Sequence, residues 1–286
     1  MSDVRVLVIR AAGINCDEEI VHCWRLAGAA PSLLQVNELA ANPKTLDDFS
    51  IVTIPGGFSY GDDLGAGVIL AQRMQHELAE PLRRLVERGG GILGVCNGFQ
   101  ALVKMGLLPG GQFSRDSLTV TYNDSAKFEA RWVKLQVCTD RCPFLRAGVG
   151  IRASARADAR GSYLELPVEH AEGKVVTATP NVAEELLRGG QVALRYVDDE
   201  GRSDRYPANP NGSTAGIAGL CDPTGRIFGL MPHPDRHFDH TQHPCWTRRA
   251  ISPSPLGRGE GEGHFTGPAD GLTVFLNAVA HWRRHG

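Results

Sequence analysis

The chain is predicted to form an α/β fold: a doubly wound, mostly parallel sheet with helices on both faces, plus an antiparallel addition in the second half. Three observations predict it. Over the first hundred residues, short apolar runs alternate with stretches of helical periodicity, which is the pattern of βαβ units. After residue 110, strand-like runs follow one another without such stretches. The length of 286 residues is enough for one large domain or two small ones.

The parallel part contains four expected strands, each a short apolar run, at residues 4–9, 32–36, 50–54 and 92–95. A helix at 17–27 follows the first strand, with its apolar residues on one face and Gly28 as its C-cap. One long helical stretch, 65–88, precedes the fourth strand. Because crossovers between parallel strands are right-handed, these helices should cover both faces of the sheet. Sites in such sheets form at the carboxyl ends of the strands.

The second half contains five further strand-like runs, at residues 118–122, 128–137, 163–168, 174–177 and 191–197. No helix is expected among them, so an antiparallel arrangement is predicted. The stretch 219–230 is predicted to be a hairpin, since Asp-Pro-Thr-Gly is a strong turn signal between two apolar runs. Residues 251–270 are rich in Gly, Pro and Ser and should be a flexible insertion, before an amphipathic helix at 271–283. We expect 1–286 to be a single domain.

The composition excludes several classes of protein. A formal charge of −2 gives no basic footprint for nucleic acid. The apolar runs are too short to span a membrane, and the N-terminus lacks the layout of a signal peptide, so the protein is expected in the cytoplasm. The seven cysteines are odd in number and form no Cys-x-x-Cys pair, which argues against a disulfide framework and a zinc knuckle.

Cys96 stands where the fourth strand gives way to a helix. The local pattern Gly94-x-Cys96-x-Gly98 has the form of a nucleophile elbow, because small flanking residues allow a sharp turn that exposes one nucleophilic atom. The N-terminus of the following helix favours thiolate over thiol. A buried structural cysteine is the ordinary alternative. The glycines on both sides favour a nucleophile instead.

A cysteine nucleophile needs a base, and an imidazole oriented by a carboxylate is the usual one. Of the ten histidines, His233 is the best candidate, since it follows a predicted strand and Asp235 comes two residues later, with Pro234 stiffening the backbone between them. A solvated turn is the alternative interpretation. The oxyanion of an acyl intermediate also needs donors, and the backbone N–H groups of Asn97 and of the turn at Gly57 could supply them.

Two other patterns suggest binding sites but lack the spacing that such sites need. Five side chains crowd one segment without the spacing of a closed zinc site, so no metal is predicted there; they are His233, His237, His240, His243 and Cys245. The glycine-rich stretch 56–67 lacks the Gly-Lys-Ser/Thr ending of a phosphate loop and the Gly-x-Gly-x-x-Gly of a dinucleotide turn. No nucleotide or other cofactor is therefore expected on this chain.

Four motifs carry a resemblance to a known family. They are Gly-Gly-Phe-Ser-Tyr-Gly-Asp at 56–62, Gly-Val-Cys-Asn-Gly-Phe-Gln at 94–100, Asn-Pro-Asn-Gly-Ser at 209–213 and Met-Pro-His-Pro-Asp-Arg at 231–236. The second and fourth resemble the class I glutamine amidotransferases in general. The first and third resemble one member of that class, the glutamine amidotransferase component of phosphoribosylformylglycinamidine synthase. The resemblance runs from about residue 4 to 238.

The resemblance implies hydrolysis of glutamine, with the ammonia passed to a synthetase that makes formylglycinamidine ribonucleotide in purine synthesis. Cys96 would be the nucleophile, His233 the base and then the acid, and Gly57 and Asn97 the oxyanion donors. Gln100 would contact the substrate. The resemblance places ATP and magnesium on the partner, which is a large synthetase chain with or without a small bridging subunit.

Two departures from the family pattern stand out. The family usually carries Glu where this chain has Asp235, and a side chain one methylene shorter should orient the imidazole more loosely. The chain is also longer than the stand-alone subunits, mainly at 145–165 and 237–270, and these insertions resemble the amidotransferase end of the fused, long form of the synthase.

Two other functions stay open at this point. One is a different cysteine enzyme of the same fold class, either an amidotransferase of another pathway or a peptidase-like relative, which the Asn-Pro-Asn-Gly-Ser motif argues against. The other is a non-catalytic subunit that only binds the synthetase, with Asp235 marking a decayed triad.

Overall fold

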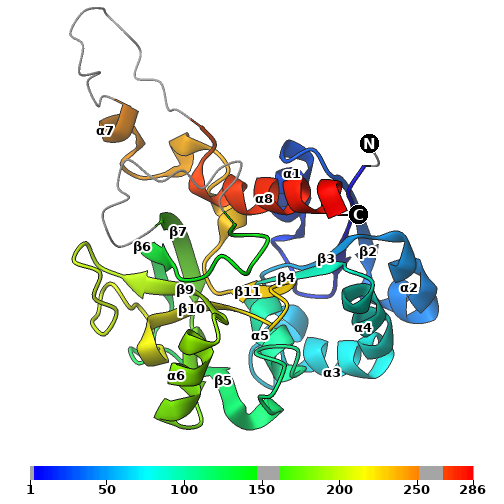
Figure 1. Ribbon diagram of the computed structural model, residues 1–286, viewed down its shortest axis with the longest axis horizontal. Coiled ribbons are helices and arrows are strands. Elements are labelled where there is room, and N and C mark those ends of the chain that lie inside the picture. The colour runs from blue at the N-terminus through cyan, green and yellow to red at the C-terminus, as the bar shows by residue number, and fades with distance from the viewer. Residues whose placement is uncertain (1–2, 147–161, 251–266, 286) are drawn as a thin grey trace, which may run out of the picture.

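The computed structural model describes residues 3–146, 162–250 and 267–285. In this part of the chain, one sheet has nine strands in the order β2-β1-β3-β4-β11-β10-β9-β6-β7. Helices cover both of its faces (Figure 1). The predicted α/β class is confirmed, and the parallel and antiparallel parts are two halves of the same sheet.

The parallel half consists of β1 (Arg5–Arg10), β2 (Ala30–Gln35), β3 (Ile51–Ile54), β4 (Gly91–Val95) and β11 (Ile227–Leu230). Every residue of β3, β4 and β11 is buried. Strands covered on both faces carry continuous apolar runs, and such runs are visible in a sequence. The four strands predicted from them lie within two residues of the observed ones.

The helices form two layers around this half. On one face, α1 (Asp17–Leu26) lies beside α8 (Asp270–His285), and on the other lie α3 (Val68–Glu77), α4 (Ala79–Glu87) and α5 (Asn97–Lys104) (Figure 1). A short helix that was not predicted, α2 (Val36–Ala41), follows β2. Gly28, with φ +81°, comes just after the last turn of α1, where a residue without a side chain is favoured.

Trp24 fastens the α1–α8 layer to the sheet. Its ring meets that of Phe275 edge-on, with centroids 4.9 Å apart, and its indole N–H donates to Thr53 Oγ1 at 3.0 Å. Both aromatic rings are fully buried. One contact therefore joins α1, α8 and β3.

The prediction of one long helix over 65–88 is wrong. The chain leaves the helical conformation at Leu78 (φ −127°, ψ 1°), which separates α3 from α4. Pro81 gives the physical reason, because in a continuous helix its ring would clash with the carbonyl of Glu77. In the first turn of a new helix, Pro81 is tolerated.

The antiparallel half adds β10 (Ile217–Cys221), β9 (Val192–Val197), β6 (Glu129–Val137) and β7 (Tyr163–His170). A separate pair is formed by β5 (Leu118–Thr121) and β8 (Lys174–Thr177). The antiparallel addition and the hairpin at 219–230 are confirmed. The prediction that no helix lies among these strands is wrong, since α6 (Pro180–Arg188) follows β8, with Pro180 in its first turn.

Strand β7 is the last strand in the sheet order, yet its carboxyl end lies over the carboxyl ends of the central strands. The N–H of His233, just after β11, donates to Pro167 O at 2.8 Å. The sulfur of Cys96, just after β4, lies 3.7 Å from Glu169 O. The sheet therefore curls until its antiparallel edge closes over the centre of its parallel half.

The last predicted elements have different outcomes. Helix α8 confirms the helix expected at 271–283. The flexible insertion expected at 251–270 falls mostly outside the described residues, and before it the chain forms the short helix α7 (Trp246–Ala250). No helix among the described residues is long and apolar enough to cross a membrane.

Candidate functional site

Cys96 occupies a strained turn between β4 and α5. Its φ is +49° and its ψ −104°, a backbone conformation that residues other than glycine rarely adopt. Its N–H donates to Leu230 O of β11 at 2.8 Å. A Cβ on Gly98 would lie 2.0 Å from Ile54 O, and one on Gly94 2.8 Å from Gly98 O. The two glycines thus let α5 start directly against β3 and β4, which leaves the cysteine at the point of the turn.

His233 and Asp235 lie just beyond β11, at the next strand's carboxyl end. They are only 2% and 0% exposed, which overturns the interpretation of a solvated turn. The imidazole Nδ1 is 3.4 Å from the Asp235 carboxylate oxygens. A charge-assisted hydrogen bond is about 2.7–2.9 Å long. One carboxylate oxygen, Oδ1, has no hydrogen-bond partner, so the contact that orients the ring is a loose one.

Gly56 is the point at which the side chains of the site converge. A Cβ on this residue would lie 2.7 Å from His233 Cε1, 3.4 Å from Cys96 Cβ and 3.4 Å from Cys16 Sγ. The missing side chain therefore leaves the space in which the imidazole stands beside the cysteine. Sequence reasoning did not select Gly56 or Cys16 as site residues. Their proximity depends on the order of the central strands, β1-β3-β4-β11, which has no local sequence signal.

The electrostatics of the site favour a protonated imidazole. Burial of His233 opposes the charge, but the Asp235 carboxylate and a Cys96 thiolate favour it more strongly, and hydrogen bonds to Asp235 and Cys16 add to them. The pKa of His233 is raised well above its usual value. Near neutral pH this site thus holds a proton next to its cysteine.

The N-terminus of α5 is joined to the Gly-Gly-Phe-Ser-Tyr-Gly-Asp motif through Asn97. The Asn97 amide donates to Asp62 Oδ1 and to Gln100 Oε1, each at 3.0 Å, and accepts from the N–H of Ser59 at 3.2 Å. Gln100 in turn donates to the backbone oxygen of Glu172. Gln100 is only 3% exposed, so it is held from both sides at the inner wall of the site.

Gly57 lies in the turn after β3, against the loop that precedes α1. Its φ is +143°, and a Cβ there would be 2.8 Å from Asn15 N and from Gly13 O. It pairs with Ile14 as an isolated bridge. The structure thus brings Cys96, Asn97, His233, Asp235, Gly57 and Gln100 to one edge of the sheet.

The Asn-Pro-Asn-Gly-Ser motif holds the segment that covers the site. The Asn211 amide donates to Gly173 O at 2.8 Å and lies 3.5 Å from His170 Nε2. His170 Nδ1 is 3.1 Å from Asn123 Oδ1. Burial and the nearby His233 charge lower the pKa of His170 to about 4, so this ring is neutral. The motif therefore fixes the end of β7, whose Glu169 backbone oxygen contacts Cys96, and the turn after it, which contacts Gln100.

The histidines after Asp235 belong to an aromatic cluster around Trp132. The rings of His237 and His243 meet the indole edge-on, at centroid distances of 4.8 and 4.4 Å. His237 Nδ1 is 2.8 Å from Glu165 O. Among the described residues, the ligand atoms close enough to hold a metal ion together are instead those of Cys16, His233 and Asp235, within 4.8 Å of one another.

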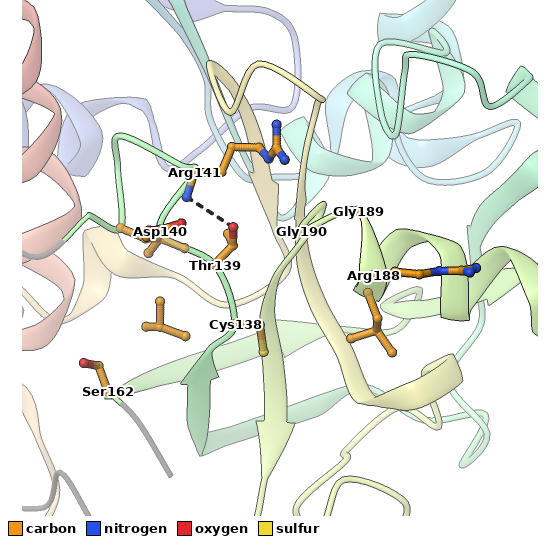
Figure 2. Close-up of a pocket in the computed structure, with 11 residues that line it drawn as sticks. Cys138, Thr139, Asp140, Arg141, Ser162, Arg188, Gly189 and Gly190 are labelled. Atoms are coloured by element: carbon orange, nitrogen blue, oxygen red, sulfur yellow. Dashed lines mark hydrogen bonds between the residues drawn. The ribbon is translucent and has the colours of Figure 1, made fainter. Parts of the chain in front are cut away.

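A hollow of about 830 Å³ lies elsewhere, between the end of β6 and the end of α6 (Figure 2). It is at the opposite edge of the sheet, because β6 runs antiparallel to β4. Its thiol is Cys138, and burial raises the pKa of that thiol to about 11. Arg188 points away from the hollow in the same view. A thiol that stays protonated near neutral pH is a poor nucleophile, so Cys138 gives this hollow no reactive sulfur.

Comparisons with known proteins agree with this geometry. Residues 3–281 match the model of the CobB/CobQ-like glutamine amidotransferase domain. The chain is 42% identical over 286 residues to the phosphoribosylformylglycinamidine synthase subunit PurQ of Dehalococcoides mccartyi, covering 99% of each chain. It is 34% identical to the subunit of that name in Methanococcus maripaludis, over 98% of each. A solved structure of PurLQS from Thermotoga maritima superposes with a TM-score of 0.68 at 29% identity, over 98% of this chain and 100% of the other.

The glycine packing at the elbow predicts that Gly98→Ala lowers the free energy of unfolding by about 1–3 kcal/mol, because the added methyl meets backbone that cannot give way. Gly189→Ala is the matched control, since Gly189 has a helical φ of −74° and a Cβ there would lie 3.1 Å from Glu185 O. Urea unfolding of both variants gives the comparison. Equal stability of the two variants would contradict the packing described here.

Proposed function

The chain belongs to the family of CobB/CobQ-like glutamine amidotransferase domains, and we propose that it works through Cys96 as the glutaminase subunit of phosphoribosylformylglycinamidine synthase in purine biosynthesis. The observation that carries the proposal is the strained Cys96 turn, which meets the buried His233–Asp235 pair in the space at Gly56. The named relatives support the pathway, because they match this chain over nearly their whole length.

The first half of the reaction is attack by the Cys96 thiolate on the side-chain amide carbon of glutamine. A C–S bond forms and the carbonyl oxygen becomes an oxyanion, for which the backbone N–H groups of Gly57 and Asn97 are the proposed donors. His233 gives its proton to the amide nitrogen and the C–N bond breaks. Ammonia departs, and the glutamyl group remains bound to Cys96 as a thioester. The raised pKa of His233 supports this assignment, since the proton is in place before ammonia departs.

The second half is hydrolysis of the thioester. The imidazole of His233, now neutral, takes a proton from water as that water attacks the carbonyl carbon. The C–S bond breaks, the thiolate returns, and glutamate is released. Gln100, at the inner wall of the site, is the proposed contact to the substrate, and its hydrogen bond with Asn97 supports a fixed orientation.

Ammonia then passes to a partner that consumes it. We assign ATP and magnesium to a large synthetase chain in the cytoplasm, with or without a small bridging subunit. No cofactor is assigned to this chain. We treat residues 1–286 as one amidotransferase domain, because α8 packs on both α1 and β7 and so joins the end of the chain to both halves of the sheet.

The rival functions receive less support. A non-catalytic subunit with a decayed triad has no need of a histidine that is buried against a carboxylate. The names of the relatives argue against an amidotransferase of another pathway or a peptidase-like enzyme.

Cys96→Ala and Cys96→Ser are expected to abolish glutamine-dependent synthesis in the complex with the synthetase, while free ammonia still supports it, because only the nitrogen supply is lost. His233→Ala should cost as much as Cys96→Ala, since members of such a unit are not additive. Rates with each nitrogen source give the result. Equal loss with glutamine and with ammonia would contradict the proposal.

The loose Asp235 contact generates a separate prediction. Asp235→Asn should lower the glutaminase kcat by about 10²-fold or more with little change in glutamine KM, because the imidazole loses the carboxylate that orients and charges it. The charge of Asp235 raises the pKa of His233, so its loss should move the alkaline limb of the kcat–pH profile to lower pH. Asp235→Glu, the control that keeps the charge, should be at least as active as the parent. A fully active Asp235→Asn enzyme would show that this carboxylate is dispensable.

A further inference from the structure

Cys16 is a buried thiol in the site that the reaction outlined above does not use. It lies just before α1 and is 1% exposed. Its backbone N–H donates to Gly56 O at 3.3 Å, so the loop before α1 is joined to the turn in which the imidazole stands. A buried free cysteine usually behaves as a small hydrophobic residue with a weak S–H donor, so its polar contacts here need an explanation.

The sulfur of Cys16 is held by polar groups on two sides. Arg236 Nη2 donates to it at 3.3 Å, and the thiol donates to Asn15 Oδ1 at 3.3 Å. Arg236 is itself ion-paired with the Glu169 carboxylate at the end of β7. The position of the sulfur is therefore set by the loop before α1, the turn after β11 and the strand that closes over the site.

The same sulfur faces the imidazole. Cys16 Sγ, a His233 ring nitrogen and an Asp235 carboxylate oxygen all lie within 4.8 Å of one another. A Cβ on Gly56 would be 3.4 Å from the sulfur and 2.7 Å from His233 Cε1, the ring carbon between the two nitrogens. The closeness of the Cys16 thiol to the ring is among the causes that raise the pKa of the imidazole.

A second contact is needed to fix the orientation of the His233 ring. The Asp235 contact of 3.4 Å is longer than a strong hydrogen bond, so that carboxylate alone fixes the orientation of the ring only weakly. A metal bridging Cys16, His233 and Asp235 is disfavoured, because the guanidinium of Arg236 already engages the sulfur lone pair and would repel a cation.

We propose that Cys16 is a positioning residue of the glutaminase site: held by Arg236, its sulfur contacts the His233 imidazole and supplies the orientation that the short Asp235 side chain gives only in part. The proposal rests on the function proposed above. The other titratable groups that act on the ring are Asp235, Cys96, Tyr196 of β9 and His170 at the end of β7. Arg236, Glu169 and Cys23 lie one contact further out, against Cys16, Arg236 and Asp235 respectively.

The test compares Cys16→Ala with Cys16→Ser in the complex with the synthetase. Cys16→Ala should lower the glutaminase kcat by about ten-fold at unchanged KM for glutamine, because a misoriented imidazole affects the transition state more than the bound substrate. The alkaline limb of its pH profile should move to lower pH, since a contact that favours the imidazolium is lost. Cys16→Ser should recover most of the rate, because a hydroxyl can still accept from Arg236 and contact the ring.

Two further comparisons separate positioning from packing. Cys221→Ala removes an equally buried thiol from the opposite edge of the sheet, and it should leave the pH profile unchanged. In the Asp235→Glu background, where a longer carboxylate reaches the ring, Cys16→Ala should cost less than it does in the parent. The proposal would be overturned if Cys16→Ala kept the parent's kcat. It would also be overturned if Cys16→Ala had the same kcat as Cys16→Ser and an unshifted kcat–pH profile.

The role of Cys16 can also be tested without glutamine, and therefore independently of the proposed function. The extent of Cys96 alkylation by iodoacetamide is measured at a series of pH values by mass spectrometry of its peptide. It reports how much of Cys96 is thiolate beside His233. In Cys16→Ala the midpoint of alkylation should move to higher pH, because a less stable imidazolium stabilises the thiolate less. If the parent has no glutaminase activity, the proposed function falls, and the alkylation midpoints still decide the role of Cys16. Equal midpoints for Cys16→Ala and the parent would contradict it.

Discussion

The rest of the structure depends on the backbone conformation of Cys96. A positive φ at a residue with a side chain costs about 1–3 kcal/mol and persists only where the surroundings determine it. Here they do so through β11, which receives the cysteine N–H, and through two glycines that let α5 begin directly against β3 and β4. The turn lies at the centre of the parallel half, where the neighbouring strands are buried along their whole length. The strain is thus held by strands that are packed on both faces.

The antiparallel half of the sheet covers the site at the Cys96 turn. Its outermost strand curls back over the centre, so that the backbone of Pro167 and Glu169 meets His233 and Cys96. The turn after β7 also receives the amide of Gln100. The buried Asn211 amide of the Asn-Pro-Asn-Gly-Ser loop fixes that turn by donating to Gly173 O. Both halves of the sheet therefore contribute to one site, although the parallel half supplies the residues proposed to react.

Local patterns in the sequence were enough for the parallel strands, the hairpin and the turn at Cys96, because apolar runs, glycines and turn residues act over a few positions. The break at Leu78 was also visible in Pro81 and was missed. The parts that could not be predicted are long-range. Nothing near Cys16 or Gly56 in the sequence indicates that they meet His233, which is more than 170 positions away. That meeting requires the order of the central strands, which places the ends of β3 and β11 on either side of β4.

The strained turn is proposed to present Cys96 as the nucleophile toward glutamine. Labelling by a glutamine-derived chloroketone tests it most directly, since attack by the thiolate expels chloride and leaves a stable thioether that mass spectrometry locates. We expect an adduct on Cys96 that forms faster than any on the exposed Cys245 and is slowed by added glutamine. Labelling of Cys245 with none on Cys96, or labelling of Cys96 that glutamine does not slow, would contradict it.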